Sequence, residues 1–301
     1  MDGFTEADVA DQSGKCFIVT GANTGIGFEV VRVLASRRAR VLLACRDKAK
    51  AEAAMRRIGR RTPGADTAFL PIDQADLDSV RAAADLAAPE PRIDALINNA
   101  GVMRPPLTRT KQGFELQFGV NHLGCFALSI LLLPTLTKTA GSRIVVTASV
   151  AHRRGRIAWD DLNAERSYDR SQRYADSKLA NMLFFFELDR RLRASGSAVT
   201  AVGCHPGIAA TDLGRHMGAL QLLVPVVGMA LNTPAMGAWP TLQAATATVA
   251  PGGYYGPNEL GGRRGPSAPA WRTRQAEDGA LARRLWDVSV AMTGIDSGLP
   301  P

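Results

Sequence analysis

The stretch Lys15-Cys16-Phe17-Ile18-Val19-Thr20-Gly21-Ala22-Asn23-Thr24-Gly25-Ile26-Gly27 decides the fold of this chain. Its apolar run over residues 16–19 predicts a buried strand, and its glycines predict a tight turn directly after that strand. A helix is expected next, because Phe28, Val31 and Leu34 recur at every third position. Backbone N–H groups point outward at the start of such a helix and attract negative charge, so this turn is a candidate phosphate site.

The three glycines of this turn suit different tasks. Gly21 allows the tight turn, Gly25 lets a phosphate approach the backbone, and Gly27 lets the helix pack closely against the strand. Their spacing is G-x-x-x-G-x-G rather than the G-x-G-x-x-G of two-domain dehydrogenases. Taken alone, the stretch fits an ordinary glycine-rich turn between a strand and a helix about as well as it fits a phosphate site.

Length and composition indicate a globular protein. The chain has 301 residues, enough for one α/β domain with an ample core or at most two small domains. Residues 1–14 are polar and acidic, so no secretion signal is expected. The apolar stretches Phe126–Leu136 and Leu220–Leu231 are shorter than the roughly 20 residues of a membrane span. We therefore expect a cytoplasmic protein without a stable membrane span.

The cysteines and histidines give no sign of a metal site. The cysteines show no C-x-x-C pair, and three of them lie inside apolar runs, which is typical of small core residues in a reduced protein. The histidines form no ligand pair. The residues concerned are Cys16, Cys45, Cys125, Cys204, His122, His152, His205 and His216.

The formal net charge of +8 raises the question of a nucleic-acid partner. Basic residues cluster at Arg56-Arg57 with Arg60-Arg61, and again along Arg153–Arg173. Acidic residues interrupt the second cluster, which is typical of a solvated surface. We interpret both clusters as solvated surface and predict no nucleic-acid partner.

Strand and helix patterns alternate along most of the chain. Strands are expected over residues 16–19, 39–45, 69–73, 93–97, 143–147 and 198–203, with helices over 48–61, 76–88, 119–139 and 174–193. This alternation predicts an α/β protein, a single-domain Rossmann-type doubly wound parallel sheet with helices on both faces. Within that one domain, 1–301, we expect residues 208–235 to form a substrate-binding lid and residues 236–301 a C-terminal extension.

Polar or glycine residues follow the end of each expected strand. In such a sheet the ligand lies outside the carboxyl ends of the strands, so these positions converge on one site. This coincidence is the strongest evidence for a site that the residues themselves provide. The positions are Gly21–Gly27, Arg46, Asp73, Asn98–Gly101, Ser149 and Pro206-Gly207.

Tyr174 and Lys178 lie one helical turn apart, so their side chains share a helix face. A phenol with its ordinary pKa of about 10 is a poor proton carrier at neutral pH. A nearby ammonium favours the phenolate, which is what general acid/base chemistry on an alcohol or carbonyl requires. Taken alone, the pair also fits an exposed tyrosine and lysine on an amphipathic helix.

Together these motifs resemble the short-chain dehydrogenase/reductase family over residues 15–211. A narrower likeness is to its retinol dehydrogenase and WW-domain oxidoreductase branch, with protochlorophyllide reductases more distant. The family motifs are Thr20–Gly27, Asn98–Gly101, Asn121, Ser149, Tyr174–Lys178 and Pro206-Gly207. The branch motifs are Ala44–Asp47, Asn121–Gly124, Ala151-His152, Arg284–Trp286 and Thr293–Ile295.

The resemblance implies a role for each of four catalytic residues. Tyr174 is expected to be the general acid/base, and Lys178 to lower its pKa and bind the nicotinamide ribose. Ser149 is expected to hydrogen-bond the substrate oxygen, and Asn121 to hold a water of the proton relay. The sequence departs from the branch at Thr147-Ala148-Ser149, which replaces a serine pair, and we align the catalytic serine with Ser149.

The resemblance also implies a nicotinamide cofactor. Asp73 would contact the adenine, residues 99–101 the adenosine ribose, and Pro206 and Ile208 the nicotinamide. Cys45 occupies the position of the acid that holds the ribose in NAD-specific relatives, and Arg46 follows it, so NADP(H) is expected to be preferred over NAD(H). The expected cofactor-binding residues are Gly21, Asn23, Thr24, Gly25, Ile26, Gly27, Arg46, Asp73, Gln74, Asn99, Ala100, Gly101, Tyr174, Lys178, Pro206, Gly207 and Ile208.

The expected lid suggests the substrate. Residues 208–235 are rich in leucine, valine and methionine, so we predict a bulky apolar carbonyl or alcohol rather than a sugar or a charged acid. His152 is expected to lie in a solvent-exposed loop. Two other functions stay open: a catalytically silent NADP-binding sensor or scaffold, and a C=C double-bond reductase. Assembly into a homo-oligomer is compatible with the sequence.

Overall fold

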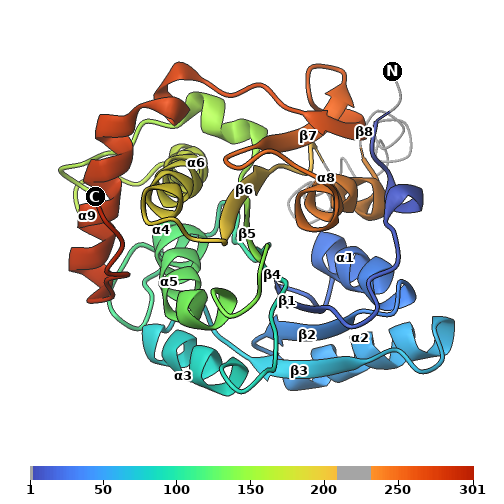
Figure 1. The fold of residues 1–301 in the computed structure, drawn as a ribbon. Coiled ribbons are helices and arrows are strands. Elements are labelled where there is room, and N and C mark those ends of the chain that lie inside the picture. The colour runs from blue at the N-terminus through green and yellow to red at the C-terminus, as the bar shows by residue number, and fades with distance from the viewer. Residues whose placement is uncertain (1–2, 209–231) are drawn as a thin grey trace.

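The computed structural model describes residues 3–208 and 232–301, which form one sheet covered by helices (Figure 1). The sheet has eight strands in the order β3-β2-β1-β4-β5-β6-β7-β8. All neighbouring pairs are parallel except β7 and β8. The strands are β1 (Cys16–Thr20), β2 (Arg40–Cys45), β3 (Thr67–Pro71), β4 (Ala95–Asn98), β5 (Arg143–Thr147), β6 (Thr200–Cys204), β7 (Tyr254–Glu259) and β8 (Arg264–Pro269).

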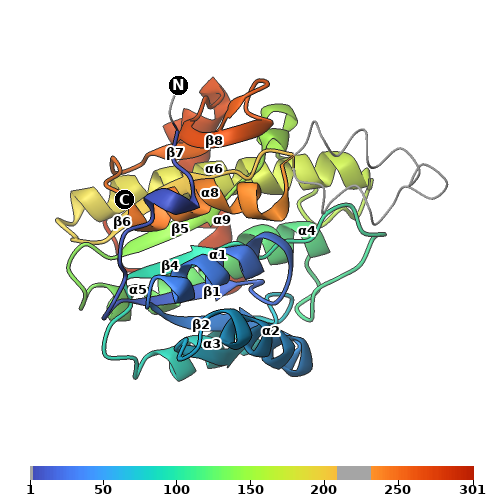
Figure 2. The same ribbon diagram turned by 90° about the vertical axis from the view of Figure 1, so that its right-hand side faces the viewer.

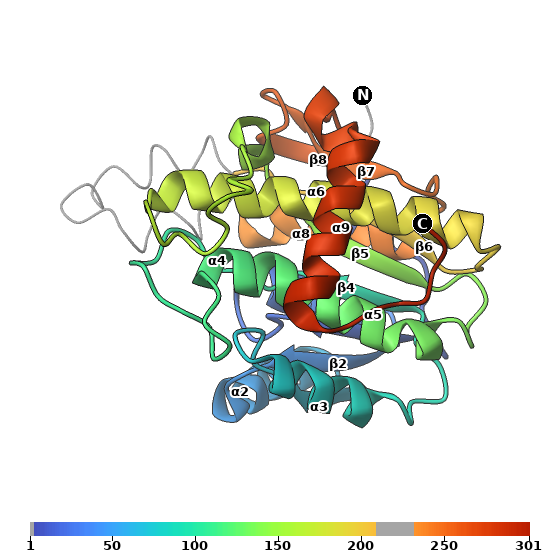
Figure 3. The same cartoon turned by 90° about the vertical axis from the view of Figure 1, so that its left-hand side faces the viewer.

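Helices cover both faces of this sheet. Figure 2 views the face that carries α1, α2 and α8, and Figure 3 views the opposite face, where α3, α5, α6 and α9 lie. The helices are α1 (Gly25–Ser36), α2 (Lys48–Arg61), α3 (Leu77–Ala87), α4 (Leu116–Phe118), η2 (Gly119–Leu123), α5 (Gly124–Leu136), α6 (Arg170–Ala194), α8 (Pro234–Thr246) and α9 (Gly279–Thr293). Shorter turns are η1 (Glu6–Asp8), η3 (Val150–Arg154) and η5 (Arg274–Glu277).

The strand β1 explains why both faces need a cover. Successive side chains of a strand point to opposite faces, so Phe17 and Val19 pack with α1 and α8, while Cys16 and Ile18 pack with α3, α5 and α6. Every residue of β1 is buried. An apolar run without polar alternation is what a central parallel strand requires. The predicted doubly wound parallel sheet is thereby confirmed.

Several predicted elements are confirmed at their bounds, whereas others shift. The helix α2 and the strand β5 span the predicted residues, and Asp76 caps α3 by accepting from the Asp78 N–H at 3.0 Å. The helix α6 begins at Arg170 rather than 174, because the carboxylate of Asp169 accepts two N–H groups of its first turn. The helix expected from residue 119 begins three residues earlier, and residues 119–123 form a π-helical turn.

The C-terminal segment contains two strands that the sequence pattern did not predict. The strand β7 pairs with β6 through Gly203 and Cys204, and β8 returns antiparallel beside it. Glycines and prolines in both strands hide the apolar alternation. Proline is tolerated in β8 because β8 is the edge strand, and in β7 because its pairing with β6 covers Tyr254 and Tyr255 and ends before Pro257. Most of the expected lid, residues 209–231, lies outside the described residues.

One helical run is long and apolar enough to cross a membrane by length and composition, in the part of the chain that the structure describes. It spans Leu116–Leu136 and has a mean hydropathy of 1.6 over its most apolar window. Within that window, 89% of the residues are buried inside the protein. Such burial is typical of a core helix, and Figure 3 shows α4 and α5 packed between the sheet and α9.

Candidate active site

The glycine turn after β1 has the close backbone approaches that its sequence predicts. Gly21 and Gly25 have φ angles of 65° and 56°, in the left-handed region that favours glycine. A Cβ atom on Gly27 would lie 2.3 Å from the Gly21 carbonyl oxygen. Only a residue without a side chain fits at position 27, so α1 begins directly against the turn and directs its N–H groups outward.

Thr20 joins this turn to the end of β4. Its hydroxyl oxygen accepts from the N–H groups of Asn99 and Ala100 at 3.0 and 2.9 Å. The Asn99 side chain donates in return to the Thr20 carbonyl oxygen at 2.9 Å. Sequence reasoning placed Thr20 in a motif but gave it no role, because its partners lie 79 and 80 residues away along the chain.

Two adjoining cavities extend from the glycine turn across the ends of β1, β2 and β3. Their volumes are about 690 and 250 Å³. Both are lined by Gly21, Asn23, Arg46, Ala100 and Gly101. The larger also contacts Thr24, Gly25, Ile26, Gly27 and Asn99, and the smaller contacts Asp73 and Gln74. A glycine turn at the start of a helix, beside the ends of neighbouring parallel strands, is the type of site at which doubly wound sheets bind phosphate-containing ligands.

Cationic side chains surround the β2 end of the cleft. Arg46 is 77% exposed, and its Nη1 lies 3.7 Å from a carboxylate oxygen of Asp73. Asp47 also lines the smaller cavity, but its carboxylate caps α2 by accepting from the Lys50 N–H at 3.0 Å and pairs with the Lys50 ammonium at 3.2 Å. Lys50 and Arg57 line the same cleft, although sequence reasoning did not name either of them as a site residue.

Gln74 and Asp73 occupy the β3 side of this cleft. Asp73 accepts the Ala75 N–H at 2.9 Å, which fixes the turn after β3. Gln74 is buried, and its backbone lies against the first turn of α5, where a Cβ on Gly124 would be 2.8 Å from the Gln74 carbonyl oxygen. The contact keeps α5 close to the cleft.

Tyr174 and Lys178 lie one turn apart on α6, as their spacing predicts. The Lys178 ammonium is buried, donates to the Thr147 carbonyl oxygen at 3.1 Å and lies 5.9 Å from the centre of the Tyr174 ring. Lys178 also lies near Gly101, where a Cβ atom would be 3.4 Å from its Nζ. The positive charge of Lys178 therefore lies between the Tyr174 ring and the cleft at the glycine turn.

Asn121 lies in the π-helical turn and holds the loop after β4. Its Oδ1 accepts the Val102 N–H at 2.7 Å, and its Nδ2 donates to the Val102 carbonyl oxygen at 2.9 Å. Nδ2 also donates to the Ser177 hydroxyl at 2.9 Å, and Ser177 donates to the Tyr174 carbonyl oxygen. Asn121 therefore connects α6 with the loop that lines the cleft.

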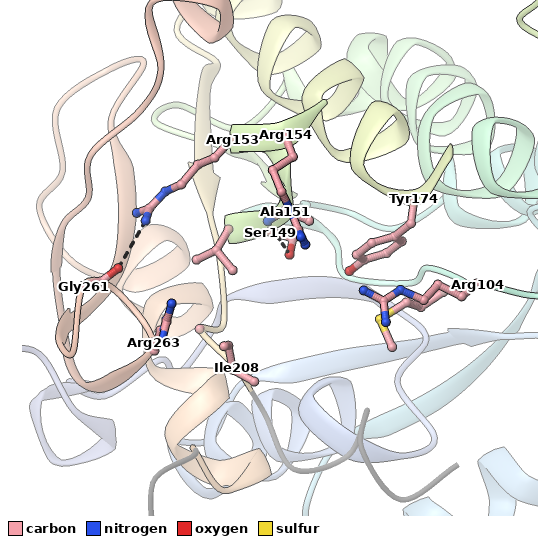
Figure 4. A pocket seen from close by; sticks show the side chains of 12 residues that line it. Arg104, Ser149, Ala151, Arg153, Arg154, Tyr174, Ile208, Gly261 and Arg263 are labelled. Atoms are coloured by element: carbon pink, nitrogen blue, oxygen red, sulfur yellow. Dashed lines mark hydrogen bonds between the residues drawn. The ribbon is translucent and has the colours of Figure 1, made fainter. Parts of the chain in front are cut away.

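Ser149 and Tyr174 line a separate cavity of about 500 Å³ (Figure 4). Ser149 caps η3, because its Oγ accepts the Ala151 N–H at 3.2 Å. A serine hydroxyl that accepts one bond keeps its proton for a further acceptor. The remaining lining residues are Met103, Arg104, Val150, Ala151, Arg153, Arg154, Gly207, Ile208, Gly261 and Arg263.

Pro206, Gly207 and Ile208 follow β6, and Gly207 and Ile208 line the cavity that contains Tyr174. Gly207 has a φ of 75°, and a Cβ there would be 2.4 Å from the Arg263 carbonyl oxygen. The Ile208 N–H donates to that same oxygen at 3.0 Å. Pro206 lies beside Ile26 of the glycine turn, since both lie against Gly237 of α8.

His152 is not in solvent, which corrects the sequence-based expectation. It is 1% exposed, and its Nδ1 lies 2.7 Å from the Ser149 carbonyl oxygen. Its ring packs edge-on against Tyr254, which also contacts His205. Burial lowers the pKa of His152 and brings that of His205 to about 3. These aromatic residues come from β7 and from the turn after β6, so nothing local in the sequence marks this burial.

The interpretation of Arg153–Arg173 as solvated surface is wrong for Arg173, whereas Arg153 and Arg154 are exposed. Arg173 is buried and pairs with Asp161 at 2.7 Å. Arg153 and Arg154 line the cavity that contains Tyr174. Arginine character alone could not distinguish these positions, because their neighbours belong to distant segments.

The chain matches the family model described as short chain dehydrogenase over residues 15–222. Human retinol dehydrogenase 13 is 43% identical over 295 residues, which cover 94% of this chain and 86% of that protein. Mouse retinol dehydrogenase 11 is 43% identical over 286 residues, covering 94% and 87%. The chain belongs to the short-chain dehydrogenase family. The resemblance to its retinol dehydrogenase branch is confirmed.

Solved structures agree with this assignment. An uncharacterised protein from Mycobacterium paratuberculosis has a TM-score of 0.83 and 38% identity, covering 99% of this dehydrogenase and 100% of that chain. L-sorbose reductase from Gluconobacter frateurii, solved with NADPH and L-sorbose, has a TM-score of 0.63 at 20% identity, covering 81% and 95%. The second likeness shows the fold alone. This dehydrogenase is an oxidoreductase acting on an alcohol or carbonyl, in a family that binds a nicotinamide cofactor.

Proposed function

We propose that this dehydrogenase interconverts an alcohol and an aldehyde or ketone with NADP(H), using Tyr174 as general acid/base. One observation carries the proposal. Ser149 and Tyr174 line a single cavity, and the buried ammonium of Lys178 lies 5.9 Å from the tyrosine ring. The cleft around the glycine turn fits the cofactor, because only a glycine is accommodated at position 27 and cationic side chains line its far end.

The chain's own residues would handle the substrate oxygen and its proton. When bound, the nicotinamide supplies or accepts the hydride. Ser149 donates a hydrogen bond to the substrate oxygen, where negative charge develops during reduction. Tyr174 gives its hydroxyl proton to that oxygen, and in the oxidation it takes the proton back. Lys178 favours the phenolate that this exchange requires.

Asn121 and Lys178 would support this proton exchange by positioning Tyr174 and by passing its proton onward. The Asn121 amide fixes Val102, and through Ser177 it fixes the helical turn that carries Tyr174. A water held at Asn121 would pass the proton onward from Lys178, which is the relay that the family resemblance implies. In this proposal Asn121 sets the position of both relay partners.

A preference for NADPH over NADH is the first expected result. Arg46 can bind a 2′-phosphate bidentately, and Asp47 is engaged in capping α2. We expect kcat/KM with NADPH to be about tenfold or more above kcat/KM with NADH. Replacing Arg46 with alanine should remove most of that preference by lowering kcat/KM for NADPH alone. Steady-state kinetics with both cofactors measures it.

Arg60→Ala provides the matched control, because Arg60 is an exposed arginine of the neighbouring helix α2 and does not line the cleft. This variant should keep the wild-type ratio of the two cofactors. Equal kcat/KM values for NADH and NADPH in the wild-type protein, or a preference for NADH, would contradict the assignment.

The second expected result is that substrates with a larger apolar part react faster. Met103, Val150, Ala151 and Ile208 line the cavity beside Ser149 and Tyr174. Each buried CH₂ contributes about 0.8 kcal/mol, so kcat/KM should rise along a series of lengthening alkyl aldehydes. Kinetics with aldehydes of increasing length checks this, and a flat or falling series would argue against it.

The same screen separates the alternative functions. A silent sensor or scaffold would turn over no carbonyl compound, and a C=C reductase would prefer enones to aldehydes and ketones. The presence of Asn121, Ser149, Tyr174 and Lys178 around one site favours the carbonyl reaction. A cytoplasmic location and assembly into a homo-oligomer stay predictions.

A further inference from the structure

Four arginines line the cavity that holds Ser149 and Tyr174. Arg104 follows β4, Arg153 and Arg154 belong to η3, and Arg263 lies between β7 and β8. Figure 4 shows their side chains around the cavity, with those of Arg104 and Arg154 near Tyr174 and Ser149. No aspartate or glutamate is among the twelve described residues that line it. The cavity therefore combines a reacting site with a concentrated positive charge.

These arginines, of which Arg104 is half-buried and the other three are exposed, form no ion pair with a carboxylate in the part of the chain that the structure describes. Among residues 3–208 and 232–301, Arg32, Arg40, Arg173 and Arg191 each form an ion pair with an aspartate or glutamate. Within that same part of the chain, none of the four cavity arginines has a carboxylate oxygen within 4.0 Å. Asp169 interacts electrostatically with Arg104 without forming an ion pair, and a cluster of like charges of this kind attracts an anion.

Two of the four are held in place by the protein. The Arg104 backbone adopts a φ of 53°, in the left-handed region, and its N–H donates to the buried Gln117 side chain at 2.9 Å. The Arg104 Nε is buried and has no hydrogen-bond partner among the described residues. Arg153 donates to the Gly261 carbonyl oxygen at 3.3 Å and lies over the Trp271 ring at 5.1 Å. Such positioning preorganises guanidinium groups for a ligand.

The cofactor does not account for this charge. None of the residues that line the two cleft cavities also lines the arginine cavity. The diphosphate has its own site at the glycine turn, and the 2′-phosphate has Arg46. An anion at the arginine cavity would therefore belong to the other reactant.

We propose that the substrate carries an anionic group, a carboxylate or a phosphate ester, in addition to its reacting carbonyl and apolar body. This inference rests on the proposed function, because it concerns the same site. Guanidinium groups bind both anions through paired N–H donors, so the shared chemistry is an oxyanion with two acceptor oxygens. The proposal departs from the sequence-based expectation that a charged acid is not a substrate.

The test compares matched substrates with NADPH as cofactor. Each oxo fatty acid in a series of short, medium and long chains is assayed beside its neutral methyl ester, and beside the phosphate ester of the corresponding hydroxyaldehyde. At least one anionic member should have a kcat/KM about tenfold or more above its methyl ester. The anion that gives the higher kcat/KM, carboxylate or phosphate, identifies the preferred group. The chain length with the highest kcat/KM indicates how far that group lies from the reacting carbonyl.

Arg104→Gln and Arg154→Gln should remove this preference. Their guanidinium groups have no hydrogen-bond acceptor among the described residues, so the substitutions break no contact seen in that part of the protein. For the preferred anion, kcat/KM should fall about tenfold or more, while the methyl ester changes less than about twofold. Arg166→Gln, at an exposed arginine outside the cavity, should leave both values unchanged.

The outcomes separate this inference from the proposed function. Turnover of the methyl esters equal to or better than that of every anion, or an unchanged preference in both variants, would overturn the anionic substrate and leave the carbonyl reaction standing. Absence of turnover with every carbonyl compound of the series, charged and neutral alike, would instead contradict the proposed function, and with it this inference.

Discussion

Replacing Tyr174 with phenylalanine is expected to abolish turnover while the cofactor still binds. The substitution removes one hydroxyl group, which is the proton carrier of the proposed reaction. General acid/base catalysis contributes about a hundred- to ten-thousandfold, and kcat should fall within that range. Cofactor affinity should stay close to wild type, because the glycine turn and Arg46 line a different cavity from the tyrosine hydroxyl.

Steady-state kinetics with an alkyl aldehyde gives kcat, and titration with NADPH gives the cofactor affinity. Tyr168→Phe is the matched control, because Tyr168 donates to the Pro105 carbonyl oxygen at 2.7 Å and does not line the catalytic cavity. A Tyr174→Phe variant that keeps more than about a tenth of the wild-type kcat would have lost under about 1.4 kcal/mol of transition-state stabilisation. That result would reject Tyr174 as the proton carrier.

The Tyr174 site shows which features a sequence makes predictable. The spacing of Tyr174 and Lys178 places both on one helix face whatever surrounds that helix. The approach of Gly27 to the Gly21 carbonyl oxygen is equally local, because the two residues are close in the sequence. Strand ends converge by topology, so Ser149 and residues 99–101 could be assigned to the same edge of the sheet.

Features that depend on distant contacts could not be predicted in this way. His152 is buried because Tyr254 of β7 packs on it, and the glycine and proline of β7 concealed that strand in the sequence. Arg104 and Arg263 reach the catalytic cavity from segments about 160 residues apart. A sequence shows that arginines are abundant, but only the folded chain shows which of them surround one cavity.

Replacing Gly27 with alanine is expected to disrupt cofactor binding and to destabilise the protein. The new Cβ atom would lie 2.3 Å from the Gly21 carbonyl oxygen and 2.6 Å from Nδ2 of Asn99. Both contacts are far below van der Waals distance, and the first is with backbone, so the turn must shift. Forcing extra volume into packed structure costs about 1–3 kcal/mol or more.

The shift would affect the cofactor directly, because the turn holds the N–H groups at the start of α1 and Asn99 links it to β4. We expect NADPH affinity to fall about tenfold or more, which corresponds to about 1.4 kcal/mol of binding free energy. Titration with NADPH and denaturant unfolding measure the two effects separately.

Gly59→Ala distinguishes the contact at position 27 from the general effect of the substitution. Gly59 lies inside α2, and no atom lies within 4 Å of the position its Cβ would take, among the residues that the structure describes. Alanine there should stabilise the helix by about 0.5–1 kcal/mol without changing NADPH affinity. If Gly27→Ala instead behaved like Gly59→Ala, the tight approach of α1 to the turn would not be what positions the cofactor.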